Sequence, residues 1–332
     1  MSVRVSSEWS YRNLQALVMD NEFLRVVVLP ELGGKIWQLT AVRSGRDLLW
    51  HNPRLTARSI PFGATYDDVF LGGWDELFPN DVPEELAGEP YPDHGELWAS
   101  AWDWTVEREP GKVRLVLTLR APISGCSIEK TLTLRSGESH LRVRSRITNE
   151  GHTALPFLWK QHVAVPVSER AKIGLGARTM YVEDFGAPRA GGPGETYTWP
   201  LLVGPDGSST DMSTTLPPDS RVSEFQYATE LDGGWCSVTY EDGTGIGLAF
   251  DPGVFRSCWL FASYGGWRGH EVLVLEPCTG YPVSVAEGLE AGTHQVLAPG
   301  QTVETALTAV VYEQIAEVSG IAPDGGVEGQ SL

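Results

Sequence analysis

The sequence predicts an all-β protein, a large antiparallel β-sandwich, and three observations lead to that fold class. Short apolar segments with a period of two recur from one end of the chain to the other. Pairs of turn residues such as Asp-Gly and Pro-Gly separate these segments. Helical periodicity is nearly absent, and only Glu313–Ser319 could form a turn or two of helix. Many short strands joined by turns are typical of two packed antiparallel sheets.

The predicted strands follow one another along the chain. In residues 140–147, Leu141 and Val143 would point to one side of a strand. Arg142 and Arg144 would point to the other side, so this strand should be half-buried. The other segments that we expect to be strands are residues 14–29 (two strands), 113–120, 235–250 (two strands) and 303–312.

Two segments lack this pattern of short strands and turns. Residues 186–220 are rich in Gly, Pro, Ser and Thr and contain Trp199, so we expect a loop over one end of the sandwich, with a lid as one interpretation. Residues 320–332 (GIAPDGGVEGQSL) have little to bury, and we expect a disordered tail. No repeat or linker interrupts the remainder, so residues 1–319 are expected to form a single domain.

The composition narrows the classes of partner. The chain has 43 acidic and 25 basic residues, and its formal net charge of −18 repels nucleic acid phosphates and anionic lipid. Neither nucleic acid nor a membrane is therefore expected as a partner. No run of about 18 apolar residues could span a membrane. Residues 1–13 lack the apolar core of a secretory signal, and we expect a cytoplasmic protein.

The cysteines and the tryptophans predict different properties of the protein. The four cysteines lie far apart and form no C-x-x-C pair, which predicts reduced, buried thiols rather than a structural zinc site. Several of the twelve tryptophans stand beside Gly, Asp or His. An indole offers a flat apolar face together with an N–H donor, and ligand pockets use both. This excess favours a carbohydrate as the ligand.

His162 and Glu276 are the strongest candidates for proton transfer. If the chain around His162 is extended, one face is apolar and the other carries Lys160 and His162, which suits the floor of a polar cleft. Lys160 should then lower the pKa of His162, and it could hold an anionic group of the substrate. Glu276 ends the apolar strand 271–275, where burial would raise its pKa toward the range of a general base.

A glycine-rich turn and a polar loop supply the other predicted substrate-binding residues. Two adjacent glycines at 72–73 would let the backbone approach a ligand closely. The tryptophan that follows offers a stacking face, and the next two acids could accept hydrogen bonds from hydroxyl groups. A histidine in the loop at residues 91–98 could contact the same ligand. These residues are Trp74, Asp75, Glu76 and His94.

Taken together, these segments resemble the aldose 1-epimerase (galactose mutarotase-like) family over roughly residues 20–315. Four motifs carry the resemblance, and they occur in order along the chain. They are LPELGGKIWQL at 29–39 with RDLLWHN at 46–52, the GG…FP…HG pattern at 72–95, Asn149-Glu150-Gly151 before a strand that ends at His162, and GIGLAFDPGVF at 245–255 with Leu275-Glu276-Pro277.

The resemblance implies a fold, a reaction and a role for each residue. The fold is a galactose mutarotase-like supersandwich, and the reaction interconverts the anomers of a sugar. His94 would contact the sugar, His162 would be the general acid and Glu276 the general base. Groups of this kind contribute roughly 10²–10⁴-fold each. The resemblance implies no cofactor and no metal, and a small sugar or sugar derivative as the partner.

Three other functions remain open on the same residues. A metal-dependent sugar isomerase would use His94, Glu96 and His162 as ligands. A glycan lyase or hydrolase would use one of the acids at 75–76 together with Glu276. A non-catalytic carbohydrate-binding protein would keep the ligand contacts without placing both proton-transfer groups.

Overall fold

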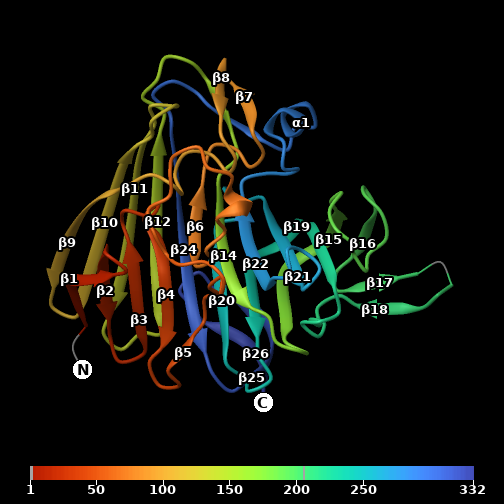
Figure 1. Ribbon diagram of the computed structural model, residues 1–332. Helices are drawn as coiled ribbons and strands as arrows, with labels where there is room; N and C mark the ends of the chain where they lie inside the picture. The colour runs from red at the N-terminus through yellow and green to blue at the C-terminus, as the bar shows by residue number, and fades with distance from the viewer. Residues whose placement is uncertain (1–2, 205) are drawn as a thin grey trace. The chain divides into compact units, whose positions relative to one another are not determined.

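The computed structural model describes residues 3–204 and 206–332, and nearly all of its regular structure is β (Figure 1). The pairs of strands described below are all antiparallel, which confirms the predicted fold class. The one α-helix of the described part of the chain is α1 (Val285–Glu290). Ser284 caps it, and Glu84 accepts hydrogen bonds from the backbone amides of Val285 and Ala286.

The chain forms two compact units, where we had expected a single domain over residues 1–319. Unit 1 comprises Met1–Val163 and Thr279–Leu307, and unit 2 comprises Ala164–Cys278 and Thr308–Leu332. The chain passes between the units three times, inside β14, directly after Cys278 and inside β24, which explains why the sequence contains no linker. The bounds of these strands are Lys160–Pro166 for β14 and Thr302–Tyr312 for β24.

Unit 1 contains two runs of consecutive antiparallel strands. In the first run β1 pairs with β2, β2 with β3, and β3 with β4, which also pairs with β5 and β6. In the second run β9 pairs with β10, β10 with β11, and β11 with β12. These strands are β1 (Arg4–Tyr11), β2 (Leu14–Asp20), β3 (Leu24–Leu29), β4 (Lys35–Ala41), β5 (Arg46–Asp47), β6 (Trp74–Leu77), β9 (Asp103–Glu109), β10 (Lys112–Arg120), β11 (Ser127–Arg135) and β12 (His140–Thr148).

Shorter elements complete unit 1. A 3-10 turn, η1 (Tyr66–Asp68), lies between β5 and β6 in the sequence. Two small pairs of strands stand outside the long runs: β7 with β8, and β13 with β23. Their bounds are β7 (Glu84–Leu86), β8 (Glu89–Tyr91), β13 (Leu155–Phe157) and β23 (Gln295–Leu297).

Unit 2 is built around one long strand, β19, which pairs with β15, β20 and β21. β21 in turn pairs with β22. The two strands predicted at 235–250, on either side of the turn at 242–243, are confirmed by the end of β19 and by β20, which are buried almost throughout. The bounds are β15 (Lys172–Val182), β19 (Val222–Thr239), β20 (Gly245–Phe250), β21 (Ser257–Tyr264) and β22 (Glu271–Cys278).

Residues 186–220 contain more regular structure than we expected. Three short strands follow one another there and pair in sequence: β16 with β15 and β17, and β17 with β18. In Figure 1 the β17–β18 hairpin extends away from the other strands of unit 2. The bounds are β16 (Thr196–Thr198), β17 (Leu201–Val203) and β18 (Ser209–Asp211).

The segment 320–332 is not a disordered tail, and this expectation is corrected. β25 (Ile315–Ile321) and β26 (Val327–Ser331) form a hairpin. Val318 and Ile321 are buried in a cluster with Tyr312, so the segment does have apolar surface to bury. The same hairpin replaces the helix that we considered for residues 313–319. The sequence PDGG, which looked unstructured, is the turn between the two strands.

All four cysteines are free and buried, as predicted. No helix within the described residues is long and apolar enough to cross a membrane.

Candidate active site

The register between β6 and β14 decides which side chains can meet. His162 lies directly opposite Asp75, and Gln161 lies opposite Glu76. Successive side chains of a strand point to opposite faces, so Asp75 and His162 share one face of the pair. Trp74 and Glu76 lie on the other face. We call these the Asp75 face and the Glu76 face.

The two glycines before β6 allow the backbone to pass close to protein groups. Gly72 has a φ of +82°, and a Cβ there would lie 2.1 Å from the carbonyl oxygen of Trp50. The Gly73 amide donates to that same oxygen over 2.8 Å. The Gly72 carbonyl accepts a hydrogen bond from Lys35 Nζ, also over 2.8 Å. The glycines thus place β6 beside Lys35 at the start of β4.

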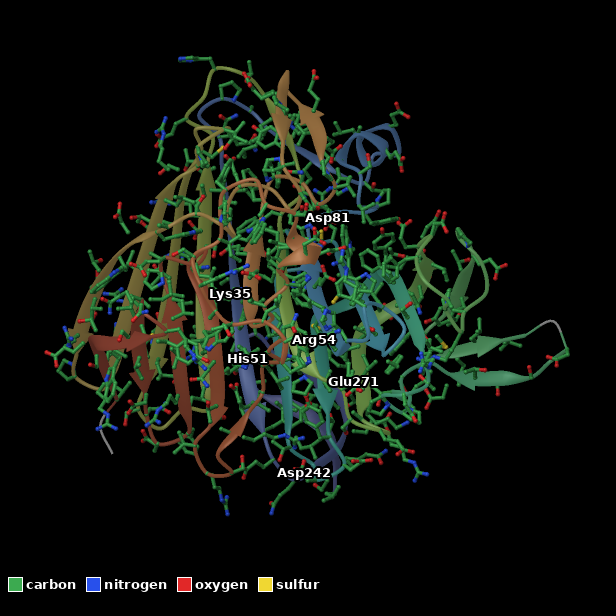
Figure 2. The ribbon with its side chains drawn as sticks, in the orientation of Figure 1. Lys35, His51, Arg54, Asp81, Asp242 and Glu271 are labelled. Atoms are coloured by element: carbon green, nitrogen blue, oxygen red, sulfur yellow. The ribbon has the colours of Figure 1, made fainter. Side chains whose placement is uncertain are left out.

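On the Asp75 face, a buried carboxylate links a lysine to a tyrosine and a histidine. Asp75 is 1% exposed and forms an ion pair with Lys35, whose side chain is 3% exposed. The Tyr66 hydroxyl lies 2.8 Å from Asp75 Oδ2 and 3.2 Å from His162 Nδ1. Burial lowers the pKa of Lys35, and Asp75 offsets part of that effect. Lys35 is labelled in Figure 2, and its charge, like that of Lys160, acts on His162.

This chain of contacts fixes the tautomer of a neutral His162. An ionised carboxylate only accepts hydrogen bonds, so the Tyr66 hydroxyl must donate to Asp75. The Tyr66 oxygen then accepts from His162 Nδ1–H, and Nε2 carries the lone pair. Among the residues described, Nδ1 is the ring nitrogen with a side-chain partner. His162 therefore offers Nε2 as a proton acceptor.

His94 lies next to this group. Its backbone φ is +60°, an uncommon conformation for a residue other than glycine. Its Nδ1 lies 2.8 Å from Asp93 Oδ1, and the other oxygen of Asp93 accepts from the backbone amide of Tyr66. The His94 ring stacks on the Tyr66 ring, with centroids 4.1 Å apart and an interplanar angle of 10°. The centroids of His94 and His162 are 6.4 Å apart.

Lys160 has a buried partner, which corrects the hypothesis that it holds an anionic substrate. Lys160 is 2% exposed and forms an ion pair with Asp81, labelled in Figure 2. Burial alone would raise the pKa of Asp81, but Lys160 and then His94 outweigh it and lower that pKa. The charge of Lys160 is therefore balanced inside the protein rather than offered to a ligand.

Burial and neighbouring charges shift the two imidazoles in opposite directions. Burial lowers the pKa of His162 well below its usual value of 6.5, and nearby cations, first Lys160 and then His94, lower it further. Burial also opposes a charge on His94, but Asp81 and Asp93 outweigh it and raise the pKa of His94. The predicted influence of Lys160 on His162 therefore has the expected direction. The raised pKa of His94 favours its imidazolium form, and the lowered pKa of His162 favours its neutral form.

On the Glu76 face, Trp74 and Glu76 have protein partners. Trp74 is 2% exposed, and its Nε1–H donates to Gln161 Oε1 over 2.8 Å. Glu76 is 1% exposed; it accepts from Trp159 Nε1 over 2.8 Å and lies 3.3 Å from Lys130 Nζ. We therefore correct the expectation that Trp74 stacks on a sugar and that Glu76 accepts from its hydroxyls, because protein encloses both side chains.

Asp75 keeps an atom that a ligand could use. Its Oδ2 is engaged by Lys35 and Tyr66, whereas its Oδ1 is buried and has no hydrogen-bond partner among the described residues. A buried carboxylate oxygen without a partner is costly unless water or a ligand supplies a donor. The prediction that Asp75 accepts from a sugar hydroxyl stays open on this atom.

Glu276 belongs to unit 2 and is located there by strand register. It is 1% exposed and lies opposite Trp259 of β21, which itself lies opposite Tyr227 of β19. The Trp259 and Tyr227 rings meet edge to face, with centroids 4.9 Å apart. Glu276 therefore ends a row of large aromatic side chains, and its role as a general base stays a prediction.

The metal-dependent alternative loses one of its ligands. Glu96 is buried, and its carboxylate accepts hydrogen bonds from the backbone amides of Ile123 and Ser124, the shortest over 2.7 Å. Burial raises the pKa of Glu96, and these hydrogen bonds offset part of that effect. Within residues 3–204 and 206–332, no three His, Cys, Asp or Glu side chains are grouped so that they could hold a metal ion.

Sequence reasoning missed several members of this cluster. Lys35 stands in the motif LPELGGKIWQL but was not singled out, and Tyr66 lies in a stretch with no strand signal. Asp81 and Asp93 each stand close in sequence to a predicted site residue, and that closeness was the available signal. What the sequence could not supply was the partner of each charge.

Comparison with known proteins identifies the fold. No protein-family model matches the sequence. A candidate aldose 1-epimerase from Klebsiella pneumoniae superposes with a TM-score of 0.74 at 13% identity, over 94% of this chain and 83% of that one. A galactose mutarotase-like protein from Clostridium acetobutylicum gives 0.67 at 12% identity, over 94% and 99%. A candidate aldose 1-epimerase from Escherichia coli gives 0.65 at 17% identity, over 91% and 100%. The chain therefore has the galactose mutarotase-like fold.

Proposed function

We infer that this chain binds a sugar at the Asp75 face and interconverts its anomers by proton transfer. The observation that carries the inference is the pair of adjacent imidazoles with opposite pKa shifts, His94 upward and His162 downward. Environments that push the pKa values of two neighbouring groups apart create one acid and one base at the same pH. The similar structures named for aldose 1-epimerase and galactose mutarotase support the same reaction class.

The chemistry needs one group of each kind. A base removes the proton of the C1 hydroxyl as the bond between C1 and the ring oxygen breaks, and an acid protonates that oxygen. The open-chain aldehyde turns about its C1–C2 bond, and closure on the other face returns both protons. The sugar is neither oxidised nor reduced, and each group ends in its starting state.

In this proposal His162 Nε2 first accepts the C1 hydroxyl proton. This reverses the starting role that the family resemblance gives to His162, because a histidine with a strongly lowered pKa rests in its neutral form. The imidazolium of His94 is the donor to the ring oxygen. Glu276 remains the alternative donor or acceptor, and the experiment below separates the two.

The charge balance of the cluster favours a neutral sugar. Lys35 is paired with Asp75 and Lys160 with Asp81, and Asp93 lies against His94. Each cation thus has its own carboxylate. An anionic sugar would add a charge without a free partner, at a buried site where unpaired charge is costly.

Anomer exchange measured by saturation-transfer NMR on neutral hexoses and pentoses tests the proposal. His162→Asn should lower kcat/KM by roughly 10²–10⁴-fold, the usual contribution of a positioned acid or base. His94→Asn should do the same if His94 is the donor, whereas Glu276→Gln should do so if Glu276 is. Full activity of His162→Asn would contradict the proposal. Sugar binding by the wild type without exchange above the uncatalysed rate would instead make the chain a carbohydrate-binding protein.

A further inference from the structure

Unit 2 contains a pocket of about 180 Å³ that shares no residue with the Asp75 face. Residues of β15, β19 and β25 line it, together with part of the segment 186–220. Its lining includes two tryptophans, Trp199 and Trp235, a lysine, a glutamate and two serines. Neither the predicted reaction nor its proposed residues account for this combination.

The indole of Trp235 is held against bare backbone. A Cβ at Gly174 would lie 2.7 Å from the Trp235 ring and 2.5 Å from Ser237 Oγ. A Cβ at Gly176 would lie 2.6 Å from Trp235 Nε1. Any side chain at these two positions of β15 would displace the ring. The glycines therefore give Trp235 a defined position at the pocket wall.

The second indole is positioned by the segment 186–220. The backbone amide of Trp199 donates to the carbonyl of Arg178 over 2.7 Å, and the carbonyl of Pro200 accepts from Met212 over 2.9 Å. Trp199 and Trp235 are both partly exposed. The pocket thus has aromatic surface from two distant parts of the chain, Trp199 and Trp235. Short strands connect the segment that contains Trp199 to β15.

The polar groups of the pocket have hydrogen-bonding capacity to spare. Ser237 is 1% exposed, and its nearest polar side chain is Tyr312, whose hydroxyl already bonds to Thr239 and makes no close hydrogen bond to Ser237 Oγ. Lys172 Nζ donates to Asp211 and to Thr214, which uses two of its three N–H groups. Glu317, an exposed residue, also lines the pocket, and a carboxylate only accepts hydrogen bonds. A ligand with both donors and acceptors could satisfy all three side chains.

We propose that this pocket is a second binding site, for a neutral pyranose ring. The C–H face of a pyranose packs on an indole, and its hydroxyls donate and accept as Glu317, Lys172 and Ser237 require. Glu317 disfavours an anionic ligand, whereas the charge of Lys172 is already balanced by Asp211. The site does not depend on the proposed reaction, because no residue of the Asp75 face takes part in it.

Methyl β-D-glucopyranoside and methyl β-D-galactopyranoside are suitable probes, because their anomeric centre is locked and cannot be interconverted. The intact chain is labelled with fluorotryptophan, and its resonances are assigned with Trp199→Phe and Trp235→Phe. Titration to about 100 mM would reveal a Kd in the millimolar range. The resonances of Trp199 and Trp235 should shift and saturate together, in the wild type and equally in His162→Asn.

Two substitutions quantify the site. Ser237→Ala should weaken the Kd about three- to tenfold, because it removes one buried hydrogen bond to the sugar. Trp199→Ala should weaken it about tenfold by removing a stacking face. If neither indole resonance shifts, or if Ser237→Ala leaves the Kd unchanged, the proposal is overturned. It is also overturned if choline shifts both resonances and the glycosides do not, since the pocket would then be a site for cations.

Discussion

Each face of β6 carries a buried acid, and the two acids have different partners. Asp75 and Glu76 are adjacent, each is 1% exposed, and each is paired with a buried lysine. On the Glu76 face the remaining partners are Trp159 and a serine, which do not change protonation near neutral pH. On the Asp75 face the next group along is Tyr66, which contacts His162.

This comparison teaches that burial and ion pairing do not by themselves mark a catalytic carboxylate. A buried carboxylate with fixed partners holds the structure together. A buried carboxylate that orients a titratable imidazole also determines which nitrogen of that imidazole is protonated. The alternation of a strand is enough to place two neighbouring acids among different partners.

The largest expected effect is on stability, on the Glu76 face. Lys130→Met leaves the carboxylate of Glu76 buried without its cation, and removing one partner of a buried ion pair costs about 3–5 kcal/mol. Urea unfolding should show that loss in the free energy of unfolding, while anomer exchange per folded molecule stays at the wild-type rate.

A partly exposed pair provides the matched control. Lys112 and Glu109 form an ion pair with side chains 24% and 45% exposed. Lys112→Met should change the free energy of unfolding by no more than about 1 kcal/mol. If Lys112→Met and Lys130→Met lower the free energy of unfolding by similar amounts, burial does not determine how much the Lys130–Glu76 pair contributes to stability.

An intermediate effect is expected on the Asp75 face, on activity. Tyr66→Phe keeps the ring that stacks on His94 and removes the hydroxyl that joins Asp75 to His162. Loss of a partner that orients a reactive imidazole commonly costs about 10–100-fold in activity. We expect kcat to fall by that amount with little change in KM.

The tautomer of His162 distinguishes this positioning role from a general loss of structure. In the wild type, ¹⁵N NMR should show Nε2 unprotonated, whereas Tyr66→Phe should give a mixture of the two tautomers. Tyr312→Phe is the control, because it removes a buried hydroxyl that bonds to Thr239. If Tyr66→Phe loses activity while the tautomer of His162 stays the same, the hydroxyl does not orient that imidazole.

The strands were predictable from the sequence because their signals are local. The period of two in residues 140–147 and the turn at 242–243 each depend on a few neighbouring residues, and both are confirmed. The hairpin β25–β26 was missed for a related reason. Its few apolar residues looked insufficient, and only contact with Tyr312 and Val310 shows that Val318 and Ile321 are buried.

The site was predictable only in part because its contacts join distant segments. Lys35 and Asp75 are 40 positions apart, and Tyr66 and His162 are 96 apart. The sequence identified His94 and His162 by their polar surroundings. It could not show that Lys160 pairs with Asp81, because that depends on how the loop after β6 returns to β14. A sequence alone does not show which charged residues form ion pairs with one another.

The smallest expected effect is a shift of the pH profile of anomer exchange, which depends on the two imidazoles at the Asp75 face. If His94 must be protonated and His162 neutral, exchange falls as the pH drops through the lowered pKa of His162, below 6.5. Exchange also falls as the pH rises through the raised pKa of His94, above 6.5. Asp93→Asn removes one group that raises the pKa of His94, so the alkaline limb should move to lower pH while the maximum rate stays nearly the same. The folded state should follow the same sign: the stability that His94 contributes is complete below 6.5 and is lost as the pH rises through its folded pKa. Titration by NMR measures the pKa values of the two imidazoles, and the exchange rate at each pH shows whether its two limbs follow them. An alkaline limb that stays in place in Asp93→Asn would exclude His94 as the proton donor and leave that role to Glu276.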